Sequence, residues 1–310
     1  MQLLKGKVAV VAGATRGAGR GIATMLGEAG ATVYCTGRST EGNPSEINRP
    51  ETIEQTAQLV TEAGGVGIWV QVDHAVPEQV QSLIKQVEVE QGRLDLLVNN
   101  ISGDHFLTEG MLSAREPIPF WAYPIEKGLA TQQSGVHTHM TTSYFAAPLM
   151  IKNQSGLIIE VNDGNALHYN DVGVYYSLSK ASVVLLAYYM SEELKPHNVA
   201  VVSLTPGWLR GEKMLDGFGV TEANWQDAVA NAPDFINSET PAYIGRAIVA
   251  LASDANIMDR TGHALSAGYL AREYGFTDVD GRQPPGYFED GMFQGGYFMQ
   301  VDKGESSNGG

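Results

Sequence analysis

One pattern near the start of the chain, in residues 8–29, does most to limit the possible folds. The apolar run 8–12 is too short for an ordinary helix, and glycines follow it at positions 13, 17 and 19. Apolar residues then recur at helical spacing, at Ile22, Ala23, Leu26 and Ala29. The segment is therefore predicted to form a strand, a turn and a helix. Gly13 permits a tight turn, while Gly17 and Gly19 let backbone amides and the positive end of the helix dipole approach a pyrophosphate. The pattern therefore predicts a dinucleotide-binding βαβ unit, although a turn that serves only the fold is the alternative.

The residues after the second predicted strand, at 31–36, indicate which dinucleotide is bound. A free ribose 2′-hydroxyl usually meets an acidic side chain there, but this stretch reads Cys35, Thr36, Gly37, Arg38. Arg16 in the turn and Arg38 present guanidinium groups that suit a 2′-phosphate. We therefore expect NADP(H) to be preferred, with NAD(H) possible, and two solvated surface arginines are the alternative. The residues of the turn expected to contact the cofactor are Gly13, Thr15, Arg16, Gly17, Ala18 and Gly19.

Length and composition are typical of an α/β enzyme that folds as one domain with additions. The chain has 310 residues, 43% of them hydrophobic, and a formal net charge of -15, which argues against nucleic acid and anionic membrane surfaces as partners. Its longest apolar runs are too short to span a membrane. Because the N-terminus runs directly into the first strand, we expect no signal peptide and a cytoplasmic protein. The single cysteine, Cys35, is expected to be a buried, inert thiol.

Strand and helix patterns alternate along most of the chain. This predicts an α/β, Rossmann-like, doubly wound parallel sheet of seven strands with helices on both faces. The remaining strands are expected at 68–72, 94–98, 156–161, 199–204 and 263–267. Helices are expected at 52–63, 77–90, 175–195 and 241–252, with a long helix ending near 150. The NADP-binding domain should span 1–270.

Two segments interrupt or follow this pattern. Residues 102–130 are expected to form a loop-rich insertion, whose aromatic residues either line a substrate entrance or pack on the domain. Residues 271–310 should form a C-terminal extension that packs on the domain or on a partner subunit. The apolar stripe of the helix at 175–195 faces either the core or a partner, which is compatible with a homodimer or homotetramer.

Tyr176 and Lys180 form the second informative pattern, because residues four apart share one face of a helix. A free phenol has a pKa of about 10, so proton exchange near pH 7 requires about 4 kcal/mol of added stabilisation of the phenolate. A neighbouring ammonium supplies part of it. This spacing occurs by chance in many helices, and by itself it does not indicate an enzyme.

Together with the glycine turn, this pair resembles the short-chain dehydrogenase/reductase family over about residues 5–270. The other residues that carry the resemblance are Asp73, Asn99, Asn100, Ile101, Ser102, Pro206 and Gly207. The resemblance implies that Asp73, with His74 beside it, holds the adenine edge and that Asn99 braces the sheet. It also implies that Lys180 binds the nicotinamide ribose and tunes Tyr176, and that Tyr176 exchanges the proton. Ile101, Ser102, Pro206 and Gly207 are expected to contact the cofactor.

The family and a subgroup within it predict the activity. The ending at 270–276 and 280–282 further resembles the dehydrogenase/reductase family member 1-like subgroup. The implied function is hydride transfer between NADP(H) and a small carbonyl or alcohol substrate, in a dehydrogenase/reductase. The alternatives are an epimerase or dehydratase that keeps the cofactor bound, and a protein that senses NADP(H) without turnover.

Three positions depart from the family pattern. Asp163 stands where the family usually has a serine that binds the substrate carbonyl, Gly135 stands at the usual asparagine, and Gly211 lies near the expected threonine. An ionised carboxylate about 5 Å from the phenol would oppose phenolate by roughly 3 kcal/mol at an effective dielectric near 20. Asp163 is therefore protonated and donates a hydrogen bond, or binds a cationic or hydroxyl-bearing substrate, or belongs to a site with little redox chemistry. A cap for the loop around Gly164 is the structural alternative.

The remaining candidate residues carry weaker signals. Asp163, His168 and Trp208 are the candidate substrate contacts, although an ordinary loop residue is the alternative for His168. His137 and His139 are expected to be packing or solvated residues. The spacing of His, Cys and carboxylate residues predicts no metal site.

Overall fold

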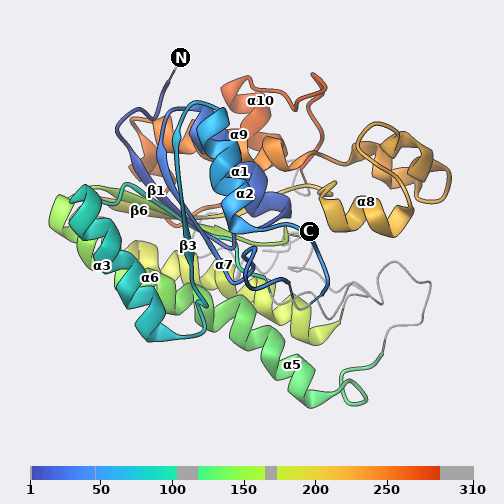
Figure 1. Ribbon diagram of the computed structural model, residues 1–310, viewed down its shortest axis with the longest axis horizontal. Helices are drawn as coiled ribbons and strands as arrows, with labels where there is room; N and C mark the ends of the chain where they lie inside the picture. Colours follow the sequence, from blue (N-terminus) through green and yellow to red (C-terminus); the bar gives the residue numbers. More distant parts are fainter. Residues whose placement is uncertain (1, 46, 103–117, 165–172, 287–310) are drawn as a thin grey trace, which may run out of the picture.

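The strands form one parallel sheet in the order β3-β2-β1-β4-β5-β6-β7 in the computed structural model of the chain (Figure 1). The structure describes residues 2–45, 47–102, 118–164 and 173–286. The strands are β1 Val8–Ala12, β2 Thr32–Gly37, β3 Val66–Gln71, β4 Leu96–Asn99, β5 Gly156–Val161, β6 Val199–Thr205 and β7 Ala264–Ser266. The order reverses between β1 and β4, and ligands of such sheets bind at the carboxyl ends of the strands beside this switch point. The predicted doubly wound fold is confirmed.

Helices cover both faces of the sheet, as Figure 1 shows. One layer contains α1, α2, α9 and α10, and the other contains α3, α6 and α7. Their bounds are α1 Gly17–Glu28, α2 Ile53–Glu62, α3 Pro77–Gln91, α6 Thr138–Asn153, α7 Val174–Leu194, α9 Pro241–Ser253 and α10 Ala267–Tyr274. α5, Ile125–Gln132, extends the second layer, and α8, Glu212–Phe218, lies at the side of the molecule.

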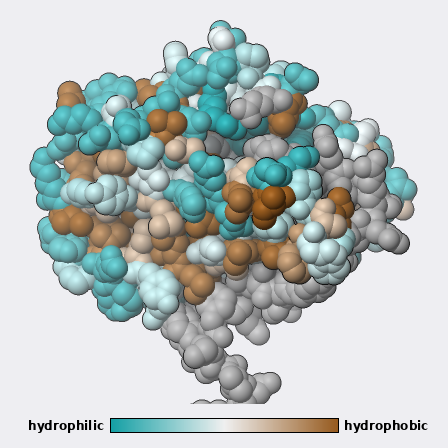
Figure 2. Space-filling view, turned by 90° about the horizontal axis from the view of Figure 1, so that it is seen from below, coloured by the Kyte–Doolittle hydropathy of each residue, from teal (hydrophilic) through white to brown (hydrophobic). Residues whose placement is uncertain are grey.

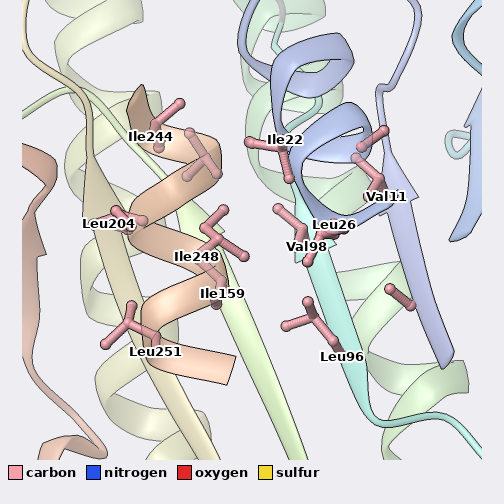
Figure 3. Packing of buried hydrophobic residues seen from close by; sticks show 14 of the residues in the cluster. Val11, Ile22, Leu26, Leu96, Val98, Ile159, Leu204, Ile244, Ile248 and Leu251 are labelled. Atoms are coloured by element: carbon pink, nitrogen blue, oxygen red, sulfur yellow. The ribbon is translucent and has the colours of Figure 1, made fainter. Parts of the chain in front are cut away.

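Strand residues alternate between two hydrophobic cores, because successive side chains of a strand point to opposite faces. In β1, Ala9 and Val11 join the core beneath α1 and α9, whereas Val8 and Val10 join the core beneath α3 and α6. Figure 3 shows the first core, where side chains of α1 and α9 meet those of β1, β4, β5 and β6. Burial on both faces explains why these strands read as continuous apolar runs.

The long helix predicted before residue 150 is interrupted. α5 and α6 are joined by a π turn at Gln133–His137, in which one extra residue is inserted into the helix. An extra residue rotates the helix that follows. Apolar residues on the two sides of the turn therefore no longer follow one 3.6-residue period. The structure thus contains the predicted long helix, which ends at Asn153, and the π turn within it was not predicted.

Two helices in the last third of the chain were not predicted. α8 has seven residues and is too short to show a periodic signal. α10 carries ordinary end signals, because the Ser266 side chain accepts a hydrogen bond from the Tyr269 amide and Gly275 adopts a left-handed conformation after it. The predicted domain boundary at residue 270 falls within this helix, so its pattern was divided between two segments.

The described part of the C-terminal extension contacts the domain. Asp278 Oδ2 accepts a hydrogen bond from the Thr240 amide at 2.8 Å, and the Arg282 guanidinium lies 4.9 Å from the ring centre of Trp225. Residues 287–310 lie outside the described residues. Within the described part of the chain, no helix combines the length and apolar character needed to cross a membrane.

Candidate active site

The glycine turn packs tightly against the end of β4. A Cβ atom at Gly13 would lie 3.0 Å from the Asn100 carbonyl oxygen, and one at Gly19 would lie 2.0 Å from the Gly13 carbonyl oxygen. Gly13 also has a φ of 83°, which favours glycine. The Asn100 side chain donates to the Gly13 carbonyl at 3.1 Å. The turn is thus held in a shape that only glycine permits, and it exposes the N-terminus of α1 at the switch point.

Tyr176, Asp163 and Lys180 come together from β5 and α7. The Tyr176 hydroxyl donates a hydrogen bond to Asp163 Oδ2 at 2.8 Å, and Lys180 Nζ lies 5.5 Å from the centre of the tyrosine ring. Asp163 lies two residues after the end of β5, and Tyr176 lies in the first turn of α7. The structure therefore brings a phenol, a carboxylate and an ammonium to the carboxyl ends of the strands.

Arg16 is embedded in a small charged group beside the turn. Its Nε donates to Glu51 at 3.4 Å, and Glu51 also accepts two bonds from Arg49 at 2.6 and 2.9 Å. Burial lowers the pKa of Arg16, although the Glu51 carboxylate opposes this effect. Arg16 Nη2 is buried and meets no hydrogen-bond acceptor among the described residues. Arg38 is exposed after β2.

Glu212 is a site residue that the sequence did not indicate. It begins α8, and its Oε2 accepts a hydrogen bond from the Gly17 amide at 2.8 Å. Gly211 lies beside it, where an added Cβ atom would be 3.4 Å from Gly17 Cα. A carboxylate therefore contacts the N-terminus of α1, the place where the sequence predicted a pyrophosphate. No local pattern could have shown this contact, because it joins residues 195 positions apart.

Other residues that were predicted to bind the cofactor lie at the same end of the sheet. Asn99 is fully buried and donates to Ser143 at 2.9 Å and to Glu160 at 2.8 Å. The Ser102 hydroxyl is buried and has no partner among the described residues. Thr15 and Ala18 are buried within the turn.

Of the two residues after β3, Asp73 makes a local contact and His74 contacts distant elements. Asp73 Oδ1 accepts from the Ala75 amide at 2.9 Å. His74 contacts Thr36 and Thr142, both at 2.8 Å. Burial, together with the charge of His139, lowers the pKa of His74 to about 3, so this ring is neutral at pH 7.

Trp208 and His168 are the other two residues predicted to contact the substrate. Trp208 packs on an aromatic cluster, with its ring centre 5.2 Å from that of Phe235 and 6.4 Å from that of Phe218. This cluster is built from residues on and after α8. His168 lies outside the described residues.

The comparisons with known proteins agree with this geometry. Residues 7–216 match the short chain dehydrogenase family. The chain is 38% identical over 288 residues to the mouse protein dehydrogenase/reductase SDR family member 1, covering 92% of this chain and 87% of that protein. The human protein of the same name is 37% identical over 287 residues, with the same coverage. The chain belongs to the short-chain dehydrogenase/reductase family. Within it, the chain falls in the dehydrogenase/reductase family member 1-like subgroup.

Solved structures of the family share the fold. A short-chain type dehydrogenase/reductase from Mycobacterium marinum superposes with a TM-score of 0.66 at 24% identity, covering 86% of this chain and 96% of that one. A metagenomic short-chain oxidoreductase, solved in complex with NADP, gives a TM-score of 0.62 at 24% identity, covering 82% of this chain and 94% of that one.

The structure locates the three departures from the short-chain dehydrogenase/reductase pattern. Asp163 contacts Tyr176, as described above. Gly135 lies in the π turn, where an added Cβ atom would be 3.3 Å from Ser179 of α7. Gly211 lies against Gly17 of the turn. All three departures therefore fall at the predicted site rather than elsewhere in the fold.

The two histidines of the helix before β5 differ in their surroundings. His137 is exposed. His139 is buried and uses both ring nitrogens in hydrogen bonds, so the expectation of a packing or solvated residue missed its polar contacts. Across the described residues, no three His, Cys, Asp or Glu side chains are grouped so that they could hold a metal ion. Cys35 is buried, and burial raises the pKa of its thiol to about 12.

Glu239 lies buried beneath the turn of Pro206 and Gly207. Its Oε2 accepts a hydrogen bond from the Gly207 amide at 2.8 Å, while Oε1 has no partner among the described residues. Burial raises the pKa of this carboxyl to about 8; the Gly207 amide opposes this effect, and the Asp278 carboxylate adds to it. Glu239 is therefore largely protonated at pH 7, beside a segment predicted to contact the cofactor.

Glu239 should make the fold less stable as the pH rises. Its folded-state pKa lies above its unfolded value of about 4.3, so between these pH values only the folded chain keeps the proton and stability falls by up to about 1.4 kcal/mol per pH unit. We expect Glu239→Gln to remove this slope, so that its gain in unfolding free energy over the wild type is larger at pH 8 than at pH 5. Urea unfolding at both values measures it, with Glu41→Gln on the exposed loop as the control. If the unfolding free energy changed equally with pH in all three proteins, the raised pKa assigned to Glu239 would be contradicted.

Proposed function

We propose that this chain is an NADP(H)-dependent oxidoreductase that transfers hydride between the nicotinamide and a small carbonyl or alcohol substrate. The observation that carries the proposal is the contact of Tyr176 with Asp163, with Lys180 beside the ring, at the same edge of the sheet as the glycine turn. Membership of an oxidoreductase family supports the reaction class. The NADP complex of a structural relative supports the cofactor type.

The residues present fit a dinucleotide. The glycine turn leaves no room for side chains between the backbone and the N-terminus of α1. The Gly17 amide already binds a carboxylate, which shows that this helix end accepts an anion. Arg16 Nη2 is a buried donor with no acceptor among the described residues, as expected of a donor that binds a phosphate oxygen of the ligand. When bound, NADP(H) supplies or accepts the hydride.

The side chains would divide the remaining work between them. In the reductive direction, Tyr176 would give its hydroxyl proton to the substrate oxygen, and Lys180 would stabilise the phenolate that remains and bind the ribose. Asp163 holds the Tyr176 hydroxyl in the resting site. Its own proton, or a hydroxyl or cationic group of the substrate, would offset its charge during turnover. The same carboxylate favours the second candidate function, an NADP(H) sensor without turnover, because an uncompensated charge opposes the phenolate and the developing oxyanion.

A panel assay tests this proposal directly. Purified protein should bind NADPH and oxidise it only when a carbonyl compound is added, with aldehydes, ketones and quinones as the first classes. Binding without oxidation by any class would favour the sensor, and the absence of binding would overturn the proposal. Release of an isomerised or dehydrated product without net NADPH consumption would indicate the epimerase or dehydratase alternative.

The cofactor preference gives a second prediction. We expect Arg16→Ala to weaken NADP(H) binding by about 10- to 100-fold, because a charge-assisted hydrogen bond is worth about 1.5–3 kcal/mol. NAD(H) binding should change little, since it lacks the 2′-phosphate. Isothermal titration with both dinucleotides measures the ratio, and Arg93→Ala at the opposite end of β4 is the matched control. Equal weakening of both dinucleotides would remove the proposed phosphate contact.

The role of Asp163 gives a third prediction. Asp163→Ser restores the usual family residue and removes a charge beside Tyr176, so the pH profile of alcohol oxidation should move to lower pH and the rate at pH 7 should rise about tenfold. Asp163→Asn keeps the size of the side chain and should share this shift if charge is its cause. An unchanged profile in both variants would show that the carboxylate has no part in the chemistry.

We also propose that the chain forms a homo-oligomer through α7. Apolar or aromatic side chains of α7 and α6 are exposed along the face seen in Figure 2, where hydrophobic residues lie among hydrophilic ones. They are Val174, Leu178, Leu185 and Tyr189 on α7, and Met140 and Tyr144 on α6. Their spacing on α7 places them on one side of the helix. A second copy of the chain would cover this surface. The mass of the protein in solution gives its oligomeric state and so tests the proposal.

A further inference from the structure

A hydrogen-bonded pair of titratable side chains lies buried beneath the candidate site. His139 of α6 is 1% exposed and Glu160 of β5 is 0% exposed. His139 Nδ1 lies 2.5 Å from Glu160 Oε2, and its Nε2 lies 2.8 Å from the carbonyl oxygen of Ile101. The pair therefore joins the second helix layer to the segment that follows β4.

The partners fix where one proton lies. A carbonyl oxygen only accepts hydrogen bonds, so His139 Nε2 carries a proton. Glu160 Oε1 accepts from Asn99 Nδ2 at 2.8 Å and from the Ser143 hydroxyl at 3.3 Å, as a carboxylate does. The hydrogen bond between Nδ1 and Glu160 Oε2 occupies the other ring nitrogen, so the orientation of the imidazole is fixed from both sides.

A buried polar pair of this kind contributes little to stability, because the loss of hydration offsets the attraction within the pair. Its contacts indicate a different role. Ile101, which His139 holds by its carbonyl oxygen, packs on the glycine turn, because its Cα atom lies 3.2 Å from the place of a Cβ atom at Gly13. The Asn100 side chain also donates to the Gly13 carbonyl. A continuous set of contacts thus runs from Glu160 through His139 to the glycine turn.

The helix geometry aims His139 at this position. The π turn at Gln133–His137 immediately precedes it and rotates the helix that follows. His139, Thr142 and Ser143 consequently lie on one face of α6, and each makes a buried hydrogen bond toward the ends of the strands or the residues after them. π turns of this kind frequently occur at functional sites.

We propose that His139, held by Glu160, is a positioning residue that fixes Ile101, by its carbonyl oxygen, against the glycine turn and thereby sets the affinity for the dinucleotide. This inference rests on the proposed function. The pair acts on the shape of the binding site and touches no reacting atom.

Variants of the pair test the inference through binding rather than turnover. His139→Gln places an amide against the Glu160 carboxylate, and we expect NADP(H) to bind at least tenfold more weakly, with KM for the dinucleotide raised and kcat little changed. The double variant His139→Gln/Glu160→Gln allows the two amides to pair and should recover part of the affinity. Asp95→Asn is the matched control, because Asp95 is 9% exposed and ion-paired with Lys7 and Arg93 at the amino end of β4. It should lose comparable stability in urea with less than a twofold change in dinucleotide affinity.

Two results would overturn the inference. One is a dinucleotide affinity of His139→Gln that equals the wild type or follows stability as it does in Asp95→Asn. The other comes from the wild-type protein and applies even if His139→Gln does not fold: a ¹⁵N spectrum of labelled histidine in which His139 Nε2 carries no proton and so cannot donate to the Ile101 carbonyl. Failure of the wild type to bind NADP(H) would overturn the proposed function, whereas normal wild-type binding with unaffected variants would overturn only the positioning role.

Discussion

Tyr176→Phe should lower the rate of carbonyl-dependent NADPH oxidation by about 10²- to 10⁴-fold, the usual contribution of a positioned acid or base. The substitution removes only the hydroxyl that donates to Asp163 at 2.8 Å. The ring that packs near Lys180 remains, so NADP(H) affinity should stay within about twofold. Stopped-flow measurement of NADPH oxidation gives the rate, and titration gives the affinity.

Tyr175→Phe is a close control for this experiment. Tyr175 is the preceding residue of α7, and its ring packs on Tyr123 with a centre-to-centre distance of 5.5 Å. Its hydroxyl is not placed in the proposed chemistry, so its rate should remain near that of the wild type. If Tyr176→Phe kept full activity, the proton would have to come from another group, and the proposed acid/base role would be lost.

Local sequence patterns were sufficient for most of the fold. β1 and β5 begin and end as predicted, because each is an apolar run bounded by residues that stop a strand. β3 begins two residues earlier than the predicted residue 68, since it is an edge strand and its exposed Val66 carries no burial signal. The pairing of Val66 with Thr32 sets this boundary, and pairing between strands is not visible in local sequence.

The candidate site was predictable only where family motifs mark it. The sequence indicated Tyr176, Lys180 and Asp163, and spacing from the tyrosine was sufficient to suspect the departure at Asp163. It did not indicate Glu212 or the pair of His139 and Glu160. Glu160 lies within an apolar strand and His139 follows a π turn, so their contact depends on tertiary packing. The site residues that the sequence did not indicate are therefore those held by contacts between distant elements.

The contact of Glu212 with Gly17 would link binding of the proposed cofactor to α8. A phosphate at this helix end would replace the carboxylate, since two negative groups cannot share one amide without repulsion. α8 also carries Asp216, which forms an ion pair with Arg49 at 2.5 Å. Of these two acidic contacts, that of Glu212 lies on the turn predicted to receive the pyrophosphate, whereas Asp216 contacts Arg49, which shares Glu51 with Arg16.

The glycine turn gives the second large expected effect, in Gly19→Ala. A Cβ atom there would lie 2.0 Å from the Gly13 carbonyl oxygen, so the turn must open, at a cost of about 1–3 kcal/mol or more. Opening the turn moves the amides away from the phosphate, and we expect NADP(H) affinity to fall at least tenfold. Differential scanning fluorimetry with and without NADP(H) measures both effects, because bound ligand raises the melting temperature.

Two other glycines separate the loss of binding from the loss of stability. Gly67→Ala places a Cβ atom 1.9 Å from the Ala57 carbonyl oxygen, between β3 and α2, and should destabilise the fold without changing dinucleotide affinity at temperatures where it is folded. Gly42→Ala meets nothing within 4 Å and should change neither property. If Gly19→Ala bound NADP(H) as well as Gly67→Ala did at equal stability, the turn would not be the phosphate site. Because the same turn receives the contacts of Asn100 and Glu212, that outcome would also remove the basis for a coupling between α8 and the cofactor.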